Sequence, residues 1–389
     1  MKIPITKTSF TVKDFEKINI PLESGWVVQG PLVKEFEEKW SKFSGSINSI
    51  AVSSCTTALH LSLIVAGIKN GDEVIVPSFT WIATANAVEY TGAKPIFCDI
   101  DLDTFNIDVN KIEELITPRT RAIIPVHLFG LSAEMDTIIK IASRYNLVII
   151  EDAACGFASR YKNKHVGNFG LTGCFSFHPR KAITTGEGGM ITTSDENIAS
   201  KLRSLRDHGA DLTDYSRHSS NKPFLLPEFR TLGYNYRMTD IQAALGSSQM
   251  DRAQWIVENR RRVANVYDEF LKDIEILKYP QTPTECYHSY QSYVCLYQPE
   301  DWSIDGILKA NEKRNSLMQR LFDEGISTRP GTHAVHMTQY YSKKYGIKKE
   351  DFLKSFIADR CSIALPLYPT MTDEEISYVI KNLKKHLHT

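Results

Sequence analysis

The stretch RAIIPVHLFGLSAEMDTIIKIASRYNLVIIED, residues 121–152, decides the fold class of this chain. Its two apolar runs, RAIIPVHLF and LVIIED, flank the helix-like segment AEMDTIIKIASRYN. A strand, a helix and a second strand in this order are typical of parallel strands joined by a crossover helix. Because strands this apolar are buried on both faces, the stretch predicts an α/β protein with a mostly parallel central sheet sandwiched by helices.

The same alternation extends over about residues 47–195. SIAVSS, EVIVP and KPIFCDID are strand-like, whereas TTALHLSLIVAGI and ATANAVEYTG are helix-like. CFSF and GMITT add two further strands, and the polar residues 209–232 predict a loop. A long helix is expected to follow from Thr239 towards Leu271.

Beyond that helix the rhythm of the sequence changes. The Tyr-rich run SYQSYVCLYQ predicts a strand, and KRNSLMQRLFDEG predicts a helix. We therefore expect a large domain over residues 1–250. Residues 251–389 are expected to form a linking helix and a smaller C-terminal α/β domain.

Composition limits the classes of partner. The chain has 389 residues, with 46 Lys and Arg against 46 Asp and Glu, so its charge gives no electrostatic case for nucleic acid or an anionic membrane. MKIPITKTSF lacks an apolar run followed by a cleavage site, and no apolar run is long enough to cross a bilayer. The seven cysteines form no C-x-x-C pair. Free thiols in a reducing cytoplasm are the simplest interpretation, with no metal site.

Small hydroxyl residues follow the first strand in SSCTTALHL, residues 53–61. A helix that starts there presents free backbone N–H groups at its N-terminus, which attract phosphate. An ordinary N-cap is the alternative explanation for a Ser or Thr at this place. The chain contains neither a Walker A motif nor G-x-G-x-x-G, so the usual nucleotide loops do not apply.

Two further side chains follow the ends of strands. Asp152 ends the apolar run of LVIIEDAACG, at the edge where open α/β sheets bind ligands. A buried carboxylate needs a cationic or hydrogen-bonding partner, although Asp152 could instead cap the next turn and Glu151 could have the structural role. Trp81, in PSFTWIATAN, could stack on a planar ring or lie in the core or an interface.

Lys181 lies within FSFHPRKAITTGEGGMITT, residues 175–193. A lysine amine becomes a nucleophile when it is deprotonated or held as a Schiff base, whereas a solvated lysine before a glycine turn is the plain alternative. Taken together, the chain offers a phosphate cup, a flat aromatic side chain, a strand-end carboxylate and a lysine. Pyridoxal 5'-phosphate (PLP) needs these four groups for its phosphate, its ring, its pyridine nitrogen and its aldehyde.

In these motifs the chain resembles the DegT/DnrJ/EryC1/StrS family of nucleotide-sugar aminotransferases, which are PLP enzymes of fold type I (aspartate-aminotransferase-like). The matching stretches are GPLVKEFEEKW, SSCTTALHL, VIVPSFTWIATANA, PVHLFG, EDAACG, FSFHPRKAITTGEGGM and GYNYRMTDIQAALG. They follow the order of the family, and SFHPRK followed by TTGEGG is highly specific. TRPGTHAVHMTQYY and ALPLYPTMTDEEI match more loosely.

The resemblance implies a role for each matching residue. Lys181 is expected to form the internal aldimine with PLP, Asp152 to pair with the pyridinium nitrogen, and Trp81 to stack on the ring. The residues expected to hold the cofactor phosphate are Thr56, Thr57, Ser176 and Asn235. In the family the Asn of GYNYR reaches the phosphate from the neighbouring subunit, which implies a homodimer with shared active sites.

The chain departs from the family pattern at one position. Family members usually carry a Gln three residues after the aspartate, where this chain has Cys155, and a thiol is a weak hydrogen-bond donor. Cys155 is kept as a candidate neighbour of the cofactor. His178 and Arg180 are expected to be structural neighbours of Lys181 and not catalysts.

The implied reaction moves an amino group from L-glutamate, which leaves as 2-oxoglutarate, to a nucleotide-linked keto-deoxysugar. A 4-keto-6-deoxyhexose is the first candidate and a 3-keto sugar the second, for amino-sugar, O-antigen, lipopolysaccharide or related glycan biosynthesis. The N-terminal residues 1–40 are expected to contribute to the substrate site. The candidate substrate contacts are Trp26, Gln29, Gly30, Arg329, His333 and His336.

Other functions stay open at this point. The acceptor could be a cyclitol or another ketone without a nucleotide, and a non-catalytic PLP-binding regulator is a further alternative. Relatives that dehydrate a deoxysugar with a histidine in place of the lysine are excluded by Lys181. GDP, UDP and dTDP are equally compatible with the sequence as carriers.

Overall fold

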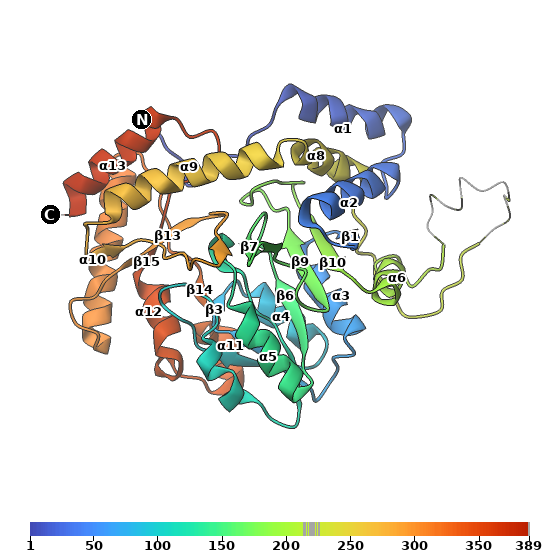
Figure 1. The fold of residues 1–389 in the computed structure, drawn as a ribbon, viewed down its shortest axis with the longest axis horizontal. Coiled ribbons are helices and arrows are strands. Elements are labelled where there is room, and N and C mark those ends of the chain that lie inside the picture. The colour runs from blue at the N-terminus through green and yellow to red at the C-terminus, as the bar shows by residue number, and fades with distance from the viewer. Residues whose placement is uncertain (213–214, 216, 218–221, 223, 225, 388–389) are drawn as a thin grey trace.

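The structure is a computed structural model that describes residues 1–212, 215, 217, 222, 224 and 226–387. The predicted loop at residues 209–232 falls partly outside these residues. A seven-stranded sheet lies at the centre, with helices around it (Figure 1). In spatial order its strands are β1 (Asn48–Val52), β10 (Gly189–Thr193), β9 (Thr172–Ser176), β6 (Val148–Asp152), β5 (Thr120–Ile123), β2 (Glu73–Pro77) and β4 (Lys94–Cys98).

The central sheet is mostly parallel, as predicted. Only β10 runs against its neighbours, since it pairs antiparallel with both β1 and β9 while the remaining neighbours pair parallel. Val74 and Val76 of β2 pack in one apolar cluster, and Ile75 between them packs in another on the opposite face. Burial of alternate side chains on both faces confirms the α/β sandwich.

Helices cover this sheet and continue into the C-terminal half. Around the sheet lie α2 (Pro31–Ser44), α3 (Cys55–Val65), α4 (Ala83–Tyr90), α5 (Met135–Tyr145), α6 (Glu196–Leu205) and α8 (Asp240–Met250). The remaining helices are α1 (Val12–Ser24), α9 (Ala253–Leu271), α10 (Ile304–Asp323), α11 (Gln339–Tyr345), α12 (Leu353–Cys361) and α13 (Asp373–Leu387).

Two predicted elements differ from the structure. The strand predicted over RAIIPVHLF ends at Ile123, because Pro125 has no N–H for the ladder. The single helix predicted from Thr239 to Leu271 is two helices, which are separated by a turn at Asp251 and Arg252. The Arg252 guanidinium binds residues near the N-terminus there, so a distant contact accompanies the break.

A second, smaller sheet lies in the C-terminal half. It is antiparallel and contains β11 (Leu277–Lys278), β13 (Tyr293–Tyr297) and β15 (Ser362–Leu365). Its apolar core includes Ile3, which also pairs with Ile326, so the N-terminus lies on this half of the molecule (Figure 1). The short strands are β3 (Phe79–Thr80) with β14 (His333–Ala334), and β12 (Cys286–Tyr287) with β7 (Arg160–Tyr161) and β8 (Lys164–His165). The domain boundary near residue 250 stays a prediction.

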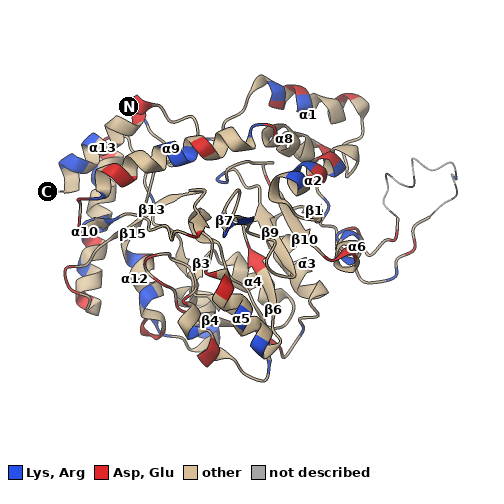
Figure 2. Ribbon diagram, in the orientation of Figure 1, with Lys and Arg blue, Asp and Glu red and all other residues tan. Residues whose placement is uncertain are grey.

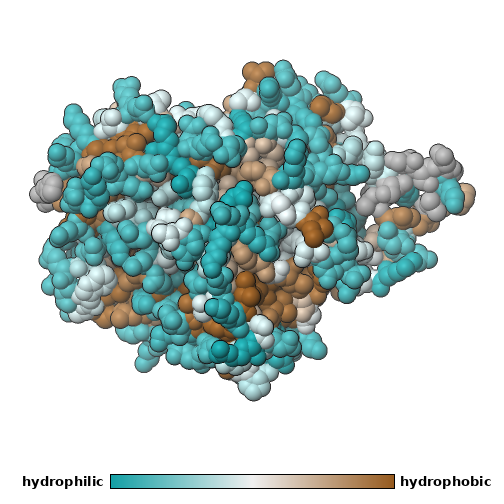
Figure 3. Space-filling model, in the orientation of Figure 1, coloured by the Kyte–Doolittle hydropathy of each residue, from teal (hydrophilic) through white to brown (hydrophobic). Residues whose placement is uncertain are grey.

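Charges of both signs are interspersed along the outer helices (Figure 2). The face in Figure 3 is mostly hydrophilic, with scattered apolar residues. Within the described ranges, no helix combines the length and the apolar character that a membrane span requires. The same residues contain no group of three His, Cys, Asp or Glu side chains placed to hold a metal ion.

Candidate active site

Four neighbouring strands place the predicted cofactor residues along one edge of the central sheet. Gly189, the first residue of β10, pairs with Val52 at the end of β1 and with Ser176 at the end of β9. Asp152, the last residue of β6, pairs with Cys174 of β9. Since β10 runs in the opposite direction, its first residue meets the carboxyl ends of the others. Such an edge is where open α/β sheets bind ligands.

The N-terminus of α3 begins directly after β1. The Thr57 N–H donates to the Ser54 hydroxyl at 3.1 Å, and the Thr57 hydroxyl donates to the Ser54 carbonyl at 2.8 Å. Ser54 therefore caps the helix, as the alternative explanation required, and Thr57 completes the capping box. The first bond of the helix runs from the Ala58 N–H to Ser54 at 3.1 Å, so the N–H groups of Cys55 and Thr56 precede the intrahelical ladder.

Gly189 lets β10 approach this helix start closely. A Cβ at Gly189 would lie 2.5 Å from both carbonyl atoms of Ser54 and 2.7 Å from the Cys55 nitrogen. Any other residue would therefore fill the space in front of the free N–H groups. The cradle fits an anionic group such as a phosphate. Ser176, opposite Gly189, is half-buried, and its hydroxyl lies 3.4 Å from the His178 backbone nitrogen.

Asp152 is 4% exposed, and both of its hydrogen-bond donors are neutral. The Thr84 hydroxyl donates to one oxygen at 2.7 Å, and the Ala154 N–H donates to the other at 3.1 Å. Burial raises the pKa of Asp152, while these two hydrogen bonds and the charge of Lys181 act in the opposite direction. A buried carboxylate with neutral donors only is stabilised by a cation, and the protonated ring nitrogen of PLP is such a group.

The adjacent Glu151 has a structural role. Its carboxylate is fully buried and accepts four hydrogen bonds, from His127 at 2.9 Å and from the backbone of Gly167, Phe169 and Gly170 at 2.6, 2.6 and 2.8 Å. Burial alone raises the pKa of Glu151, but these donors outweigh it and lower the pKa. The two neighbouring carboxylates thus have different surroundings: Glu151 accepts four hydrogen bonds, whereas Asp152 accepts two, both from neutral donors.

Lys181 is half-buried on the loop between β9 and β10. Its Nζ lies 3.1 Å from the Sγ of Cys155, so the residue that departs from the family pattern contacts the predicted nucleophile. Gln249 of α8 fixes the loop by accepting from the Thr184 N–H at 3.1 Å and donating to the Thr184 carbonyl at 2.7 Å. His178 is held by backbone contacts on the same loop, where its Nδ1 accepts from the Arg180 N–H at 3.2 Å.

Trp81 follows β3 and is 59% exposed, so it is not a core residue of this chain. The short pairing of β3 with β14 brings His333 beside it, with ring centroids 5.7 Å apart and planes inclined by 44°. His336 lies apart from this pair: it is fully buried, and its ring contacts the Ser78 hydroxyl and the Lys349 carbonyl. A substrate contact by His336 would require its ring to leave these partners.

The candidate contacts near the N-terminus form a fixed turn before α2. Asp240 accepts from the Gly30 N–H at 2.8 Å and from two further N–H groups of the α2 start, so it caps that helix from α8. The Trp26 indole N–H lies 3.3 Å from the Gln29 carbonyl, and a Cβ at Gly30 would clash with the indole at 2.2 Å. Trp26 is half-buried and Gln29 is buried.

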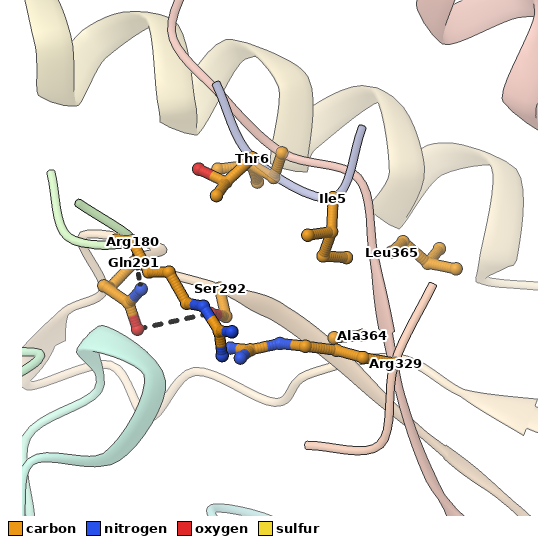
Figure 4. Close-up of a pocket in the computed structure, with 9 residues that line it drawn as sticks. Ile5, Thr6, Arg180, Gln291, Ser292, Arg329, Ala364 and Leu365 are labelled. Atoms are coloured by element: carbon orange, nitrogen blue, oxygen red, sulfur yellow. Dashed lines mark hydrogen bonds between the residues drawn. The ribbon is translucent and has the colours of Figure 1, made fainter. Parts of the chain in front are cut away.

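Asn235 is exposed, whereas Tyr234 and Tyr236 on either side pack against His60 of α3. Arg329 lies in a small cavity with Arg180 (Figure 4).

Sequence reasoning missed Thr84 and Asp240. Thr84 lies within the quoted motif PSFTWIATAN, but nothing in the letters distinguishes it from other small helix residues. Its contact with Asp152 joins positions 68 residues apart, and the contact of Asp240 with Gly30 joins positions 210 apart. Contacts at such separations depend on tertiary structure and leave no periodic signal.

Comparisons with known proteins agree with this geometry. The DegT/DnrJ/EryC1/StrS aminotransferase family matches residues 9–384. The chain is 38% identical to the spore coat polysaccharide biosynthesis protein SpsC of Bacillus subtilis, over 96% of this chain and 94% of the relative. It is 35% identical to the GDP-perosamine synthase of Escherichia coli O157:H7, over 98% of both chains.

Solved structures are also similar over almost the whole chain. Helicobacter pylori PseC, an aminotransferase involved in the biosynthesis of pseudoaminic acid, has a TM-score of 0.89 at 26% identity, covering 100% of both chains. Spr1654 of Streptococcus pneumoniae, described as a sugar aminotransferase and solved in a PLP form, has a TM-score of 0.89 at 27% identity, covering 100% of this chain and 99% of its own.

Proposed function

This chain belongs to the DegT/DnrJ/EryC1/StrS aminotransferase family, and on that premise we propose that it transfers the amino group of L-glutamate to a nucleotide-linked keto-deoxysugar. A 4-keto-6-deoxyhexose is the first candidate acceptor and a 3-keto sugar the second. The product would enter amino-sugar, O-antigen or related glycan biosynthesis. The relatives named for polysaccharide biosynthesis and for a GDP-linked sugar support this choice.

One observation carries the proposal. The buried Asp152 carboxylate accepts hydrogen bonds from neutral donors only, and the charge of Lys181 acts to lower its pKa against the effect of burial. The free N–H groups at the start of α3 lie at the same edge of the sheet, close to Gly189. This arrangement fits PLP, because it offers a carboxylate for the ring nitrogen, an amine for the aldehyde and a cradle for the phosphate. A structural neighbour solved in a PLP form also supports dependence on PLP.

Each residue has a defined task in this proposal. Lys181 would hold PLP through its amine, and Trp81 would lie against the ring. The start of α3 and Ser176 would bind the phosphate. When bound, PLP withdraws the negative charge that develops on the donor α-carbon. Asp152 keeps a proton on the ring nitrogen. The amine of Lys181 would act as the general base that removes the proton from the donor α-carbon.

We also propose that two copies of the chain share their active sites. Asn235 is exposed between two packed tyrosines, so its amide is available to a second subunit. In this arrangement the partner's amide would complete the phosphate site. The molecular mass in solution, measured with and without PLP, tests the assembly.

The reaction is tested directly with the purified protein. The PLP-loaded protein should absorb visible light, and its spectrum should shift when L-glutamate is added. Keto sugars linked to GDP, UDP and dTDP are then supplied one at a time, and the aminated product is identified by mass spectrometry. The Lys181→Arg variant should bind PLP without turnover. Full turnover by this variant, or no amination of any keto sugar by the unaltered protein, would contradict the proposal.

A further inference from the structure

Two arginines lie beside Lys181 without a role in the function above. Arg180 precedes the lysine on the same loop and is exposed, and Arg329 comes from a segment that pairs with β15. Figure 4 shows their guanidinium groups side by side in a cavity that Gln291 also lines. The cavity has about 10 Å³ of room, which is space for about one water molecule.

Neither guanidinium has a carboxylate partner among the residues that the structure describes. The Nε of Arg329 is buried and has no hydrogen-bond acceptor in this part of the chain. Gln291 does not compensate the charge, since its amide donates to the Arg180 carbonyl at 2.9 Å. Burial and, next, the charge of Arg180 lower the pKa of Arg329. Two adjacent unpaired cations are unfavourable, so the arrangement favours an anion between them.

The arginine pair adjoins the proposed reaction centre. Arg180 is bonded to Lys181 through the peptide, and Arg329 lies within electrostatic range of Cys155. The Cys155 sulfur is in turn 3.1 Å from the Lys181 amine. An anion held by both arginines therefore lies near the loop that carries the Lys181 amine.

The chemistry of the two substrates decides which anion fits. The α-carboxylate of an amino acid is attached to the same carbon as the reacting nitrogen. In a 4-keto hexose linked through C1, the diphosphate and the reacting carbon lie on opposite sides of the ring. A site immediately beside Lys181 therefore suits the carboxylate of the donor better than the diphosphate of the acceptor.

We propose that Arg180 and Arg329 together bind a carboxylate of the amino donor and of the keto acid that leaves. This inference rests on the proposed function and deepens it by naming the donor site. A guanidinium pairs with a carboxylate through two parallel hydrogen bonds, and the carboxylate separates the two positive charges. Because the cavity is narrow, the proposal requires the exposed side chain of Arg180 to move outward when the ligand binds.

The donor half of the reaction tests the proposal without an acceptor. The PLP-loaded Arg329→Gln protein is mixed with L-glutamate, and conversion of the cofactor to its aminated form is followed by absorbance. We expect the glutamate concentration at half-maximal rate to rise about 10- to 100-fold, as for the loss of a charge-assisted hydrogen bond. Arg180→Gln should act in the same direction, and Arg329→Lys should recover part of the affinity.

A binding measurement provides a second readout. Glutarate has the carbon chain of glutamate but neither its amine nor a keto group, so it binds without reacting. Calorimetry with the PLP-loaded protein should show the same loss of glutarate affinity in Arg329→Gln. Arg144→Gln is the matched control, because Arg144 is an exposed arginine whose only ion pair is with Glu113 on the surface of the described chain.

Three results would overturn the proposal. Unchanged glutamate and glutarate dependence in a folded Arg329→Gln or Arg180→Gln protein would show that no carboxylate binds there. If only the reaction with the keto sugar were impaired, the pair would be assigned to the diphosphate of the acceptor. Weaker PLP binding alone would assign it to the cofactor phosphate. If instead the unaltered protein binds glutarate but glutamate does not aminate its cofactor, the proposed function fails while the arginine site stands.

Discussion

Replacing Glu151 with Gln should strongly destabilise the protein. Each carboxylate oxygen of Glu151 accepts two hydrogen bonds: one from Phe169 and Gly170, the other from Gly167 and His127. The His127 Nδ1 accepts from the Ala133 N–H at 3.1 Å, so the other ring nitrogen carries the proton that Glu151 accepts.

Either orientation of the new amide turns its NH2 group towards two donors. Two buried N–H groups then lose their acceptor, and each costs about 1–3 kcal/mol. The expected loss in the free energy of unfolding is therefore about 2–6 kcal/mol, within which lies the loss of about 3–5 kcal/mol typical of a broken buried pair.

Urea unfolding of the cofactor-free protein measures this loss by circular dichroism. The protein concentration is held constant, because subunit association also shifts the midpoint. The control is Glu113→Gln, which removes a surface ion pair with Arg144 and should cost less than about 1 kcal/mol. A loss below about 1 kcal/mol in Glu151→Gln would refute the reasoning.

The same variant predicts a dependence on pH. The net pKa of Glu151 is lowered in the folded protein, because the His127 and backbone donors outweigh burial, which alone raises it. Its contribution to stability is therefore complete above the pKa of the unfolded chain, about 4.3, and is lost as the pH falls through the lower folded value. The difference in the free energy of unfolding between the unaltered protein and Glu151→Gln should be largest at neutral pH and should decrease in acid.

Three further variants test the site. Gly189→Ala places a methyl group against Ser54, so we expect about 1–3 kcal/mol of destabilisation and weaker PLP binding by calorimetry; unchanged binding would contradict the cradle. Thr84→Val removes a donor from Asp152 and should move the acid limb of the kcat/KM profile to higher pH, whereas Thr84→Ser should not. Asp240→Ala uncaps α2 and should cost about 2 kcal/mol, with faster hydrogen exchange confined to the first turn of that helix.

The sequence predicts the regular elements better than the contacts between them. EVIVP and GMITT are strands with the predicted bounds, because continuous apolar runs between helical segments have few other conformations in a buried sheet. The prediction of one long helix after Thr239 was wrong in one respect, because the helix is broken at Arg252. That arginine binds the Ser9 carbonyl and Asp14, which are more than 200 residues away.

The candidate site shows the same division. Lys181 and Asp152 stand out from motifs and strand ends, and their roles stay predictions supported by the surroundings described above. Cys155 was predicted as a neighbour of the cofactor, whereas its contact with the Lys181 amine is known only from the structure. The pairing of Arg180 with Arg329 left no signal in the sequence, because it joins a loop and a distant segment that meet only in the folded chain.

The reversed direction of β10 bears on the order in which the site can assemble. Since β9 and β10 are consecutive in the chain and adjacent in the sheet, one hairpin closure positions the loop of Lys181. Closing such a loop costs little chain entropy compared with a long-range contact. The Thr84 contact with Asp152, by comparison, spans 68 residues and forms only after parallel strands have paired. We expect the lysine loop to gain protection from hydrogen exchange during refolding before the contact of Asp152 with Thr84 has formed.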